Sequence, residues 1–330
     1  MVHRVPAGQR LVGGAPGPRL DGLRCLVLGA GGFLGRSLAA ALCDRGAIVQ
    51  GYGRMSEDEG RDPRAVWTNA TFADLSALAR ALEGQEVVFH LLGSSTPESS
   101  NRDPGEDLTA SVFTTVKLLD LCRSASVRKI VFASSGGTVY GVPTIIPTPE
   151  SAPTDPISAY GINKLAVEKY MALYRHLYGL DYQVLRIANP YGPGQSPFKK
   201  QGVVASIMHS ALSGHAVEIW GTGEVTRDFI HVDDVASAFL HALDYAGEQR
   251  VMNVGSGVGR TVNQIVEDVR DALGLPQIEI VRKSARAADV PVSVLDTTLI
   301  TRETGWRPRI AWQAGLARTA AWMRGTFGLA

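Results

Sequence analysis

Two residues able to carry out acid–base chemistry stand one helical turn apart. Tyr160 and Lys164 lie in the segment Ser-Ala-Tyr-Gly-Ile-Asn-Lys, residues 158–164. Side chains four residues apart share one face of a helix, so the phenol and the ammonium are neighbours. A free tyrosine has a pKa of about 10, and a nearby cation lowers that pKa by favouring phenolate. The pair therefore predicts a general base for a sugar or alcohol hydroxyl, although the same spacing alone is more often a solvated polar pair.

A glycine-rich turn near the amino end predicts a site for a pyrophosphate. An apolar run at residues 25–28 is typical of a buried parallel strand, Gly29, Gly32 and Gly35 follow, and an Ala-rich helical stretch extends to residue 43. Glycines allow a tight turn and a close backbone approach. The new helix presents free N–H groups and the positive end of its dipole to an anion. Strand, glycines and helix in this order favour a dinucleotide site over an ordinary strand-to-helix turn.

The elements that must position these residues alternate between strands and helices, which predicts a parallel sheet with right-handed crossovers. The expected strands are 24–29, 47–53, 87–92, 128–134 and 182–187. The expected helices are 33–45, 74–83, 106–124 and 159–178. Shorter elements separated by glycine-rich turns are expected at 202–213, 217–220, 233–246, 251–254 and 261–273.

This pattern predicts an α/β protein with two parts that pack as one unit. Residues 23–190 are expected to form a Rossmann-type, doubly wound parallel sheet that binds a dinucleotide. Residues 191–330 are expected to form a smaller, mainly substrate-binding domain. Residues 1–22 are rich in Gly, Pro and Arg and lack a hydrophobic signal core, so we expect a poorly ordered extension there.

Composition narrows the class of partner. The net charge of the 330-residue chain is +1 and no basic block occurs, so neither nucleic acid nor an anionic membrane surface is expected. No apolar run approaches the roughly 20 residues of a membrane span. Cys25, Cys43 and Cys122 lie in apolar or helical segments without metal spacing, which favours core thiols of a cytoplasmic protein and no metal site. His90 is expected to be a core histidine, and the Asp pair at 233–234 a helix cap.

Several motifs occur in an order that resembles a known family. They are Gly29–Gly35, Asp74–Leu75, His90–Gly93, Ser134–Gly141, Tyr160–Lys164, Arg186–Gly192 and Arg227–Asp234. Over roughly residues 23–325 the chain resembles the extended short-chain dehydrogenases/reductases, and among them the nucleotide-sugar epimerases of the UDP-galactose 4-epimerase type. The resemblance implies an enzyme with NAD as cofactor and a nucleotide-diphosphate sugar as substrate.

The resemblance also implies roles for individual residues. Tyr160 is implied as the catalytic base, and Lys164 as the residue that binds the nicotinamide ribose. Asn189, Arg227 and Arg286 are implied to hold the substrate diphosphate, a task that suits the bidentate guanidinium. The implied cofactor contacts are Gly29, Gly32, Phe33, Leu34, Gly35, Asp74, Leu75, Leu91, Leu92, Gly93, Ser94, Tyr160 and Lys164.

The chain departs from the family pattern at three positions. Gly136 replaces a Ser or Thr that holds the reacting sugar oxygen, so Thr138, Ser135 or a water must supply that contact, and Thr138 is favoured. Gly53 replaces an acid that pairs with the adenine ribose of NAD. The next residue, Arg54, would accommodate the 2′-phosphate of NADP or stack on adenine. Ser111 replaces an asparagine of the helix that lines the cofactor.

The same comparison with the family favours epimerisation over other reactions. Related 4,6-dehydratases carry Asp and Glu where this chain has Gly137 and Thr138, and related uronate decarboxylases carry a glutamate at the second position. Removal and return of a hydride at C4 needs only Tyr160, Lys164 and a retained nicotinamide. Residues 188–198 contain no cation, although Lys199 and Lys200 follow, which mildly favours a neutral hexose over a uronic acid.

The predicted function is therefore a nucleotide-sugar 4-epimerase for a UDP-hexose that inverts C4 through a 4-keto intermediate. An NADPH-dependent nucleotide 4-ketosugar reductase and a non-catalytic dinucleotide sensor remain as alternatives. Helices 106–124 and 159–178 also carry apolar residues on more than one face: Val112, Val116, Leu119, Leu165, Met171 and Leu173. The family resemblance implies that these helices pair in the four-helix bundle of a homodimer.

Overall fold

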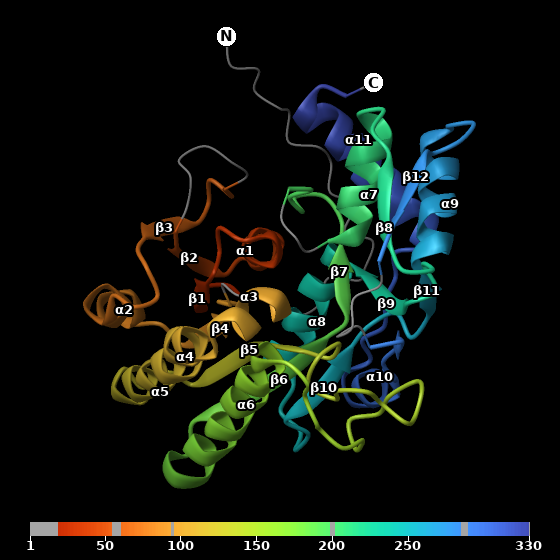
Figure 1. Cartoon of the computed structure of the whole chain (residues 1–330). Coiled ribbons are helices and arrows are strands. Elements are labelled where there is room, and N and C mark those ends of the chain that lie inside the picture. Colours follow the sequence, from red (N-terminus) through yellow and green to blue (C-terminus); the bar gives the residue numbers. More distant parts are fainter. Residues whose placement is uncertain (1–18, 55–60, 94–95, 199–201, 285–289, 330) are drawn as a thin grey trace.

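A computed structural model describes residues 19–54, 61–93, 96–198, 202–284 and 290–329 (Figure 1). The predicted amino-terminal extension lies, up to residue 18, outside the described residues. Ser94 and Arg286, two of the predicted site residues, also lie outside them.

Seven parallel strands form the main sheet in the order β10-β6-β5-β4-β1-β2-β3. Their bounds are β1 Arg24–Leu28, β2 Ile48–Gly53, β3 Val66–Asn69, β4 Val87–His90, β5 Lys129–Ser135, β6 Asp181–Ile187 and β10 Val251–Val254. The strand order reverses between β1 and β4. In doubly wound sheets ligands bind beyond the carboxyl ends of the strands at such a switch point. The predicted fold class is thus confirmed.

Helices cover both faces of this sheet (Figure 1). One face packs against α1 Phe33–Asp44, α8 Val232–Asp244 and α10 Thr298–Thr304, and the other against α2 Leu75–Leu82, α5 Thr114–Ser124 and α6 Ala159–Tyr178. Side chains alternate along β1: Cys25 and Val27 belong to the first core, and Leu26 and Leu28 to the second. This period of two buries both faces of the strand, which explains its unbroken apolar run.

The rest of the chain builds a second, smaller core beside the carboxyl edge of the sheet. Its elements are β7 Asn189–Tyr191, α7 Val203–Leu212, β8 Val217–Trp220, β9 Thr226–His231, β11 Gly259–Thr261, α9 Val262–Leu273, β12 Ile280–Lys283, β13 Val292–Ser293 and α11 Trp312–Phe327. Figure 1 shows α7, α9 and α11 gathered with β8 and β12 on the side away from α2 and α5. Helix α8 and strand β10 return to the main sheet, so residues 232–254 complete the first domain although they follow residue 190.

The segment expected as one helix over 106–124 is interrupted. Helix α4, Pro104–Leu108, is followed by a π-helical turn at Thr109–Phe113, and α5 begins only at Thr114. A short helix α3, Pro97–Arg102, precedes them. The π-helical turn contains Ser111, whose carbonyl accepts a 2.7 Å hydrogen bond from the Thr115 hydroxyl. Single π-helical turns are frequent at functional sites, and this one lies in the helix expected to line the cofactor.

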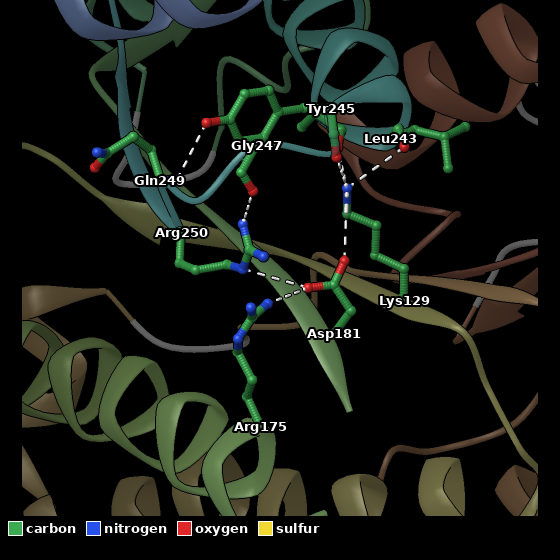
Figure 2. Close-up of polar contacts among 9 residues, drawn as sticks. Lys129, Arg175, Asp181, Leu243, Tyr245, Gly247, Gln249 and Arg250 are labelled. Carbon is green, nitrogen blue, oxygen red and sulfur yellow. Dashed lines mark hydrogen bonds and ion pairs between the residues drawn. The ribbon is translucent and has the colours of Figure 1, made fainter. Parts of the chain in front are cut away.

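A cluster of hydrogen bonds and ion pairs joins the amino ends of β5 and β6 to neighbouring helices (Figure 2). Lys129 begins β5 and donates to the Ala242 and Tyr245 carbonyls, at 2.7 and 2.6 Å, at the carboxyl end of α8. Asp181 begins β6 and accepts from Arg175 at 2.6 Å. A cation at a helix carboxyl end is stabilised by the negative end of the dipole. This cluster lies at the edge of the sheet opposite the predicted site and secures the fold.

Candidate active site

The backbone of the glycine-rich turn after β1 packs closely against itself and against the loop after β4. Gly29 has φ +87°, and a Cβ there would lie 3.2 Å from the Leu91 backbone at the end of β4. A Cβ on Gly35 would lie 2.2 Å from the Gly29 carbonyl oxygen, and one on Gly32 would lie 3.1 Å from it. Side chains at these positions would push the turn apart. The turn therefore meets the loop after β4 at the switch point of the sheet.

The amino end of α1 suits an anion. The helix begins at Phe33, its cap residue Gly32 offers no side-chain hydrogen bond, and no acidic residue occupies the first turn. The first N–H groups of a helix have no partner within the helix, so they are directed outward with the positive end of the dipole. The turn and this helix end together have the backbone geometry that a dinucleotide pyrophosphate requires. Leu34 is the second residue of the same helix.

The end of β2 lies beside the turn. Gly53 has φ +146°, and a Cβ there would be 3.7 Å from Gly29 Cα, so the two strand ends are neighbours. Arg54 follows and is exposed. Asp74 is the cap of α2, and its Oδ1 accepts a 2.9 Å hydrogen bond from the Ala77 N–H. That helix begins at Leu75, which is 38% exposed. The predicted adenine contacts, Asp74 and Leu75, thus stand at a helix start.

Tyr160 and Lys164 lie in the first turns of α6. Ser158 caps this helix by accepting a 3.2 Å hydrogen bond from the Gly161 N–H. Lys164 Nζ donates to the Ala133 carbonyl at 2.8 Å and lies 5.6 Å from the centroid of the Tyr160 ring. A Cβ on Gly93 would be 3.4 Å from the same Nζ. The structure therefore brings the predicted acid–base pair to the predicted loop after β4.

The prediction that Lys164 lowers the pKa of Tyr160 is wrong for this arrangement. Burial raises the pKa of Tyr160 to about 12, the charge of Asp107 raises it further, and a hydrogen bond with Ser135 lowers it. Burial also lowers the pKa of Lys164 to about 8, against the opposing charges of Glu168 and Asp107. Desolvation disfavours the charged form of each group, and Lys164 Nζ is directed at the Ala133 carbonyl. At neutral pH the pair is therefore a phenol and an ammonium.

The end of β5 and the loop that follows it contain the two predicted hydroxyl side chains, Ser135 and Thr138. The Ser135 side chain contacts the Tyr160 phenol through the hydrogen bond just described. Thr138 Oγ1 is buried and makes no hydrogen bond with any of the residues that the structure describes. A buried hydroxyl without a partner is costly, so an unsatisfied one at a site calls for an explanation. Both candidate hydroxyls thus lie at the end of β5 or in the loop after it, which approaches the start of α6 at Gly161.

Gly136 has a structural reason to lack a side chain. A Cβ there would lie 2.4 Å from Leu295 Cδ1 and 3.1 Å from the Arg186 carbonyl oxygen. Leu295 is 1% exposed and packs with Val139 and Tyr140. A side chain at position 136 would therefore enter an apolar cluster. For this reason the hydroxyl usual at this position has to come from another residue.

The predicted diphosphate contacts of the second domain lie on adjacent strands. Asn189 begins β7, which pairs with β9, and its Nδ2 donates to the Asp228 carbonyl at 3.1 Å. Arg227 lies on β9, and its Nη1 donates to the Thr226 and Val290 carbonyls at 2.9 and 2.6 Å. The structure brings these two residues together across one strand pair. Arg286 lies outside the described residues.

Four further residues surround the acid–base pair and were not predicted as site residues. Asn163 Nδ2 donates to Asp107 Oδ2 at 2.8 Å. Glu168, one turn after Lys164, forms a buried ion pair with Arg186 at 2.6 Å. The signal for Glu168 was its spacing, because residues 160, 164 and 168 repeat at four-residue intervals on one helix face. The contact between Asp107 and Asn163 joins distant segments and had no local signal.

His90 and His231 are both structural. His90 is buried between Phe72 and Phe132, its Nε2 lies 3.0 Å from Thr115 Oγ1, and burial lowers its pKa to about 3. The core interpretation is confirmed. The cap of α8 is His231 and not the Asp pair, since its Nδ1 accepts from the Asp233 N–H at 3.2 Å. A ring nitrogen can satisfy a free helix N–H as a carboxylate would.

Over residues 19–329, apart from the undescribed gaps, no group of three or more His, Cys, Asp or Glu residues is arranged to hold a metal ion. The helices of the same described portion include none with the length and hydropathy needed to cross a membrane. Cys25, Cys43 and Cys122 are free and buried, as the sequence predicted.

Comparison with known proteins places these features in context. The model of the NAD dependent epimerase/dehydratase family matches residues 25–255. UDP-glucose 4-epimerase of Mycolicibacterium smegmatis is 37% identical over 311 residues, which cover 92% of this chain and 99% of that protein. UDP-glucose 4-epimerase of Thermotoga maritima, solved with UDP-glucose, has a TM-score of 0.88 and 35% identity, covering 92% of this chain and 100% of that chain. The Thermus thermophilus enzyme, solved with NAD, has a TM-score of 0.85 and 32% identity, covering 92% and 99%.

Proposed function

We propose that this chain, which belongs to the NAD-dependent epimerase/dehydratase family, is an NAD-dependent nucleotide-sugar epimerase that inverts C4 of a UDP-hexose. The observation that carries the proposal is the arrangement of Tyr160, Lys164 and Thr138 at the switch point, beside an uncapped helix end that fits a pyrophosphate. The similarity to UDP-glucose 4-epimerases over nearly their whole length supports UDP-glucose and UDP-galactose as the substrate pair.

Inversion at C4 requires that a proton leaves the 4-hydroxyl and later returns to it. We assign the proton transfer to Tyr160, which Ser135 holds by a hydrogen bond that favours the phenolate. Thr138 Oγ1 would complete its hydrogen bonding with the reacting sugar oxygen. NAD, when bound, supplies the acceptor for the C4 hydride and a positive charge that favours the phenolate of Tyr160.

The remaining residues bind and orient. Lys164, an ammonium at neutral pH, would hold the nicotinamide ribose. Phe33 and Leu34 would meet the cofactor pyrophosphate through their backbone at the start of α1. The substrate diphosphate would be anchored by Asn189 and Arg227, and also by Arg286, which is assigned from its sequence pattern. With the diphosphate held, the sugar would rotate within the site and present its other face. Anchoring at a group remote from C4 allows either face of the 4-keto sugar to approach the same hydride carrier.

The direct test is conversion of UDP-galactose to UDP-glucose by the purified chain without added reductant. UDP-N-acetylglucosamine and UDP-glucuronate serve as alternative substrates that test the choice of sugar. Mass spectrometry of nucleotides released from the protein tests whether NAD is retained, as an epimerase requires. Net consumption of NADPH with a 4-keto sugar, and no interconversion of the C4 epimers, would contradict the proposal and favour the reductase.

Arg54 allows a prediction about the dinucleotide. We expect NAD to bind more tightly than NADP, because a returning hydride requires a retained cofactor in its oxidised form. If Arg54 stacks on adenine, Arg54→Ala should weaken both affinities together. If it pairs with a 2′-phosphate, the same change should weaken NADP alone by about 1.5–3 kcal/mol, the contribution of a hydrogen bond to a charged group. Calorimetric titration of NAD and NADP into the wild type and Arg54→Ala distinguishes these two roles of Arg54. Tighter binding of NADP than of NAD by the wild type would contradict NAD as the cofactor.

We also propose a homodimer. Apolar side chains of α6 and of the π-helical turn before α5 face outward: Phe113 is 54% exposed, Ile162 53%, Leu173 43% and Leu177 53%. Val112, Leu119 and Met171, three of the apolar residues that the sequence distributes over more than one helix face, pack in the core. An isologous contact would bury the outward row. We expect light scattering to give twice the chain mass at micromolar concentration, and Leu173→Glu with Leu177→Glu to give monomers; a monomeric wild type would contradict the dimer.

The three buried free thiols are typical of a reducing compartment, and we propose the cytoplasm.

A further inference from the structure

A cavity lies at the amino edge of the main sheet, opposite the candidate active site. Residues at the starts of β5 and β6 and at the carboxyl ends of α6 and α8 line it, and its volume of about 570 Å³ is within the roughly 300–1,000 Å³ of small-molecule sites. Four of the lining side chains are cations and two are acids: Arg128, Lys129, Arg175, Arg250, Asp181 and Asp244. The cavity is thus large enough for a small metabolite, and most of its charged groups are positive.

Three of the cations converge on one carboxylate (Figure 2). Arg175 Nη1 and Arg250 Nε lie 2.6 and 3.3 Å from the same oxygen of Asp181, Oδ1. Lys129 Nζ lies 4.0 Å from the other oxygen, and burial lowers its pKa to about 8, so it is an ammonium at neutral pH. One negative charge therefore faces three positive charges at close range.

The other negative groups near the cavity do not balance this excess. Asp244 pairs with Arg45 at 3.0 Å, and Arg45 is not part of the lining. The carboxyl end of α8 carries about half an elementary negative charge, and two carbonyls there accept from Lys129 at 2.7 and 2.6 Å. The carboxyl end of α6 adds a similar partial charge. With Lys129 balanced by the two helix ends, the three arginines of the lining still face Asp181 alone.

Arg175 and Arg250 retain N–H groups for a ligand. The hydrogen bond that Arg175 makes within the described residues comes from Nη1, which donates to Asp181. Arg250 Nη1 donates to the Gly247 carbonyl, and the buried Arg250 Nε makes no hydrogen bond with any described residue. A guanidinium has five N–H donors in a planar fork, which matches the oxygens of a phosphate or a carboxylate. The donors of both side chains are therefore only partly used.

We propose that this cavity binds a phosphate-bearing anion, with Arg175 and Arg250 as its principal donors and the exposed Arg128 contributing further positive charge. A phosphate group carries close to two negative charges at neutral pH and three strong acceptor oxygens, so it offsets the excess charge better than a single carboxylate does. The cavity lies outside the candidate active site, and the proposal does not depend on the reaction assigned above.

The test is calorimetric titration of inorganic phosphate into the full chain at neutral pH and low ionic strength. We expect the wild type to bind phosphate. Arg175→Gln and Arg250→Gln should each weaken that binding by about tenfold or more, the effect of losing a hydrogen bond between charged groups. Arg102→Gln is the matched control, because it removes an exposed arginine of α3, and it should leave the affinity unchanged.

Asp181→Asn should have the opposite effect, which separates loss of the site from loss of structure. The change removes the carboxylate that competes with the ligand for Arg175 and Arg250, so phosphate should bind several-fold more tightly. A variant that merely unfolds cannot gain affinity. Absence of phosphate binding by the wild type would overturn the proposal. Binding that Arg175→Gln and Arg250→Gln leave unchanged, or that Asp181→Asn does not strengthen, would overturn it as well.

Discussion

Tyr160→Phe should abolish interconversion of the C4 epimers while leaving NAD binding nearly intact. Phenylalanine fills the same space at the start of α6, but it cannot exchange a proton with the sugar 4-hydroxyl or accept the hydrogen bond of Ser135. Loss of a positioned acid–base group typically lowers kcat by about 10²–10⁴-fold. Initial rates with UDP-galactose and NAD titration of the same preparation separate the two properties.

Tyr170→Phe is a matched control, because Tyr170 lies on the same helix and is 39% exposed. It should leave both rate and affinity unchanged. A Tyr160→Phe enzyme that stayed within a few-fold of the wild-type rate would show that another group transfers the proton.

Arg186→Met should destabilise the fold strongly. The change leaves Glu168 buried without its guanidinium, and it also removes the 3.0 Å hydrogen bond from Arg186 Nη1 to the Tyr140 hydroxyl. Breaking a buried ion pair by removing one partner costs about 3–5 kcal/mol of the free energy of unfolding. Urea unfolding followed by circular dichroism measures that cost.

Two further variants test whether loss of the buried ion pair causes the destabilisation of Arg186→Met. Arg186→Met combined with Glu168→Leu should recover part of the loss, since well-packed apolar residues replace a buried pair at little cost. Arg102→Ala breaks an exposed pair with Glu98 and should change the free energy of unfolding by less than about 1 kcal/mol. If Arg186→Met behaved like Arg102→Ala, the buried pair would contribute no net stability.

The fold and the glycine turn were predictable because their signals are local. The unbroken apolar run of β1 and the glycines after it constrain the backbone wherever they occur, and Tyr160 and Lys164 share a face in any helix. The correct positions of β1, β5, β6 and α6 follow from such patterns. The folding of α8 and β10 back onto the first domain depends on packing against α1 and β6, which no local pattern describes.

Strand β9 was missed for a different reason. Its sequence contains Arg227 and Asp228, which are typical of loops and not of buried strands. In the structure Asp228 is 1% exposed and accepts hydrogen bonds from the Ser256 and Gly257 N–H groups at 2.8 and 3.1 Å. These donors come from a segment distant in the chain, and they make burial of the carboxylate tolerable. The pKa of Tyr160 depends in the same way on burial and on Asp107, neither of which the spacing from Lys164 reveals.

The packing of Leu295 against Gly136 couples the side chains that these two positions can carry. A Cβ at position 136 would lie 2.4 Å from Leu295 Cδ1, so a serine or threonine there requires the buried Leu295 side chain to shift. A smaller residue at position 295 would make room for that side chain, but without it the residue would leave a cavity in a buried apolar cluster. Large-to-small changes in a core cost about 2–5 kcal/mol for leucine to alanine. The stability effects of substitutions at positions 136 and 295 are therefore expected to be non-additive.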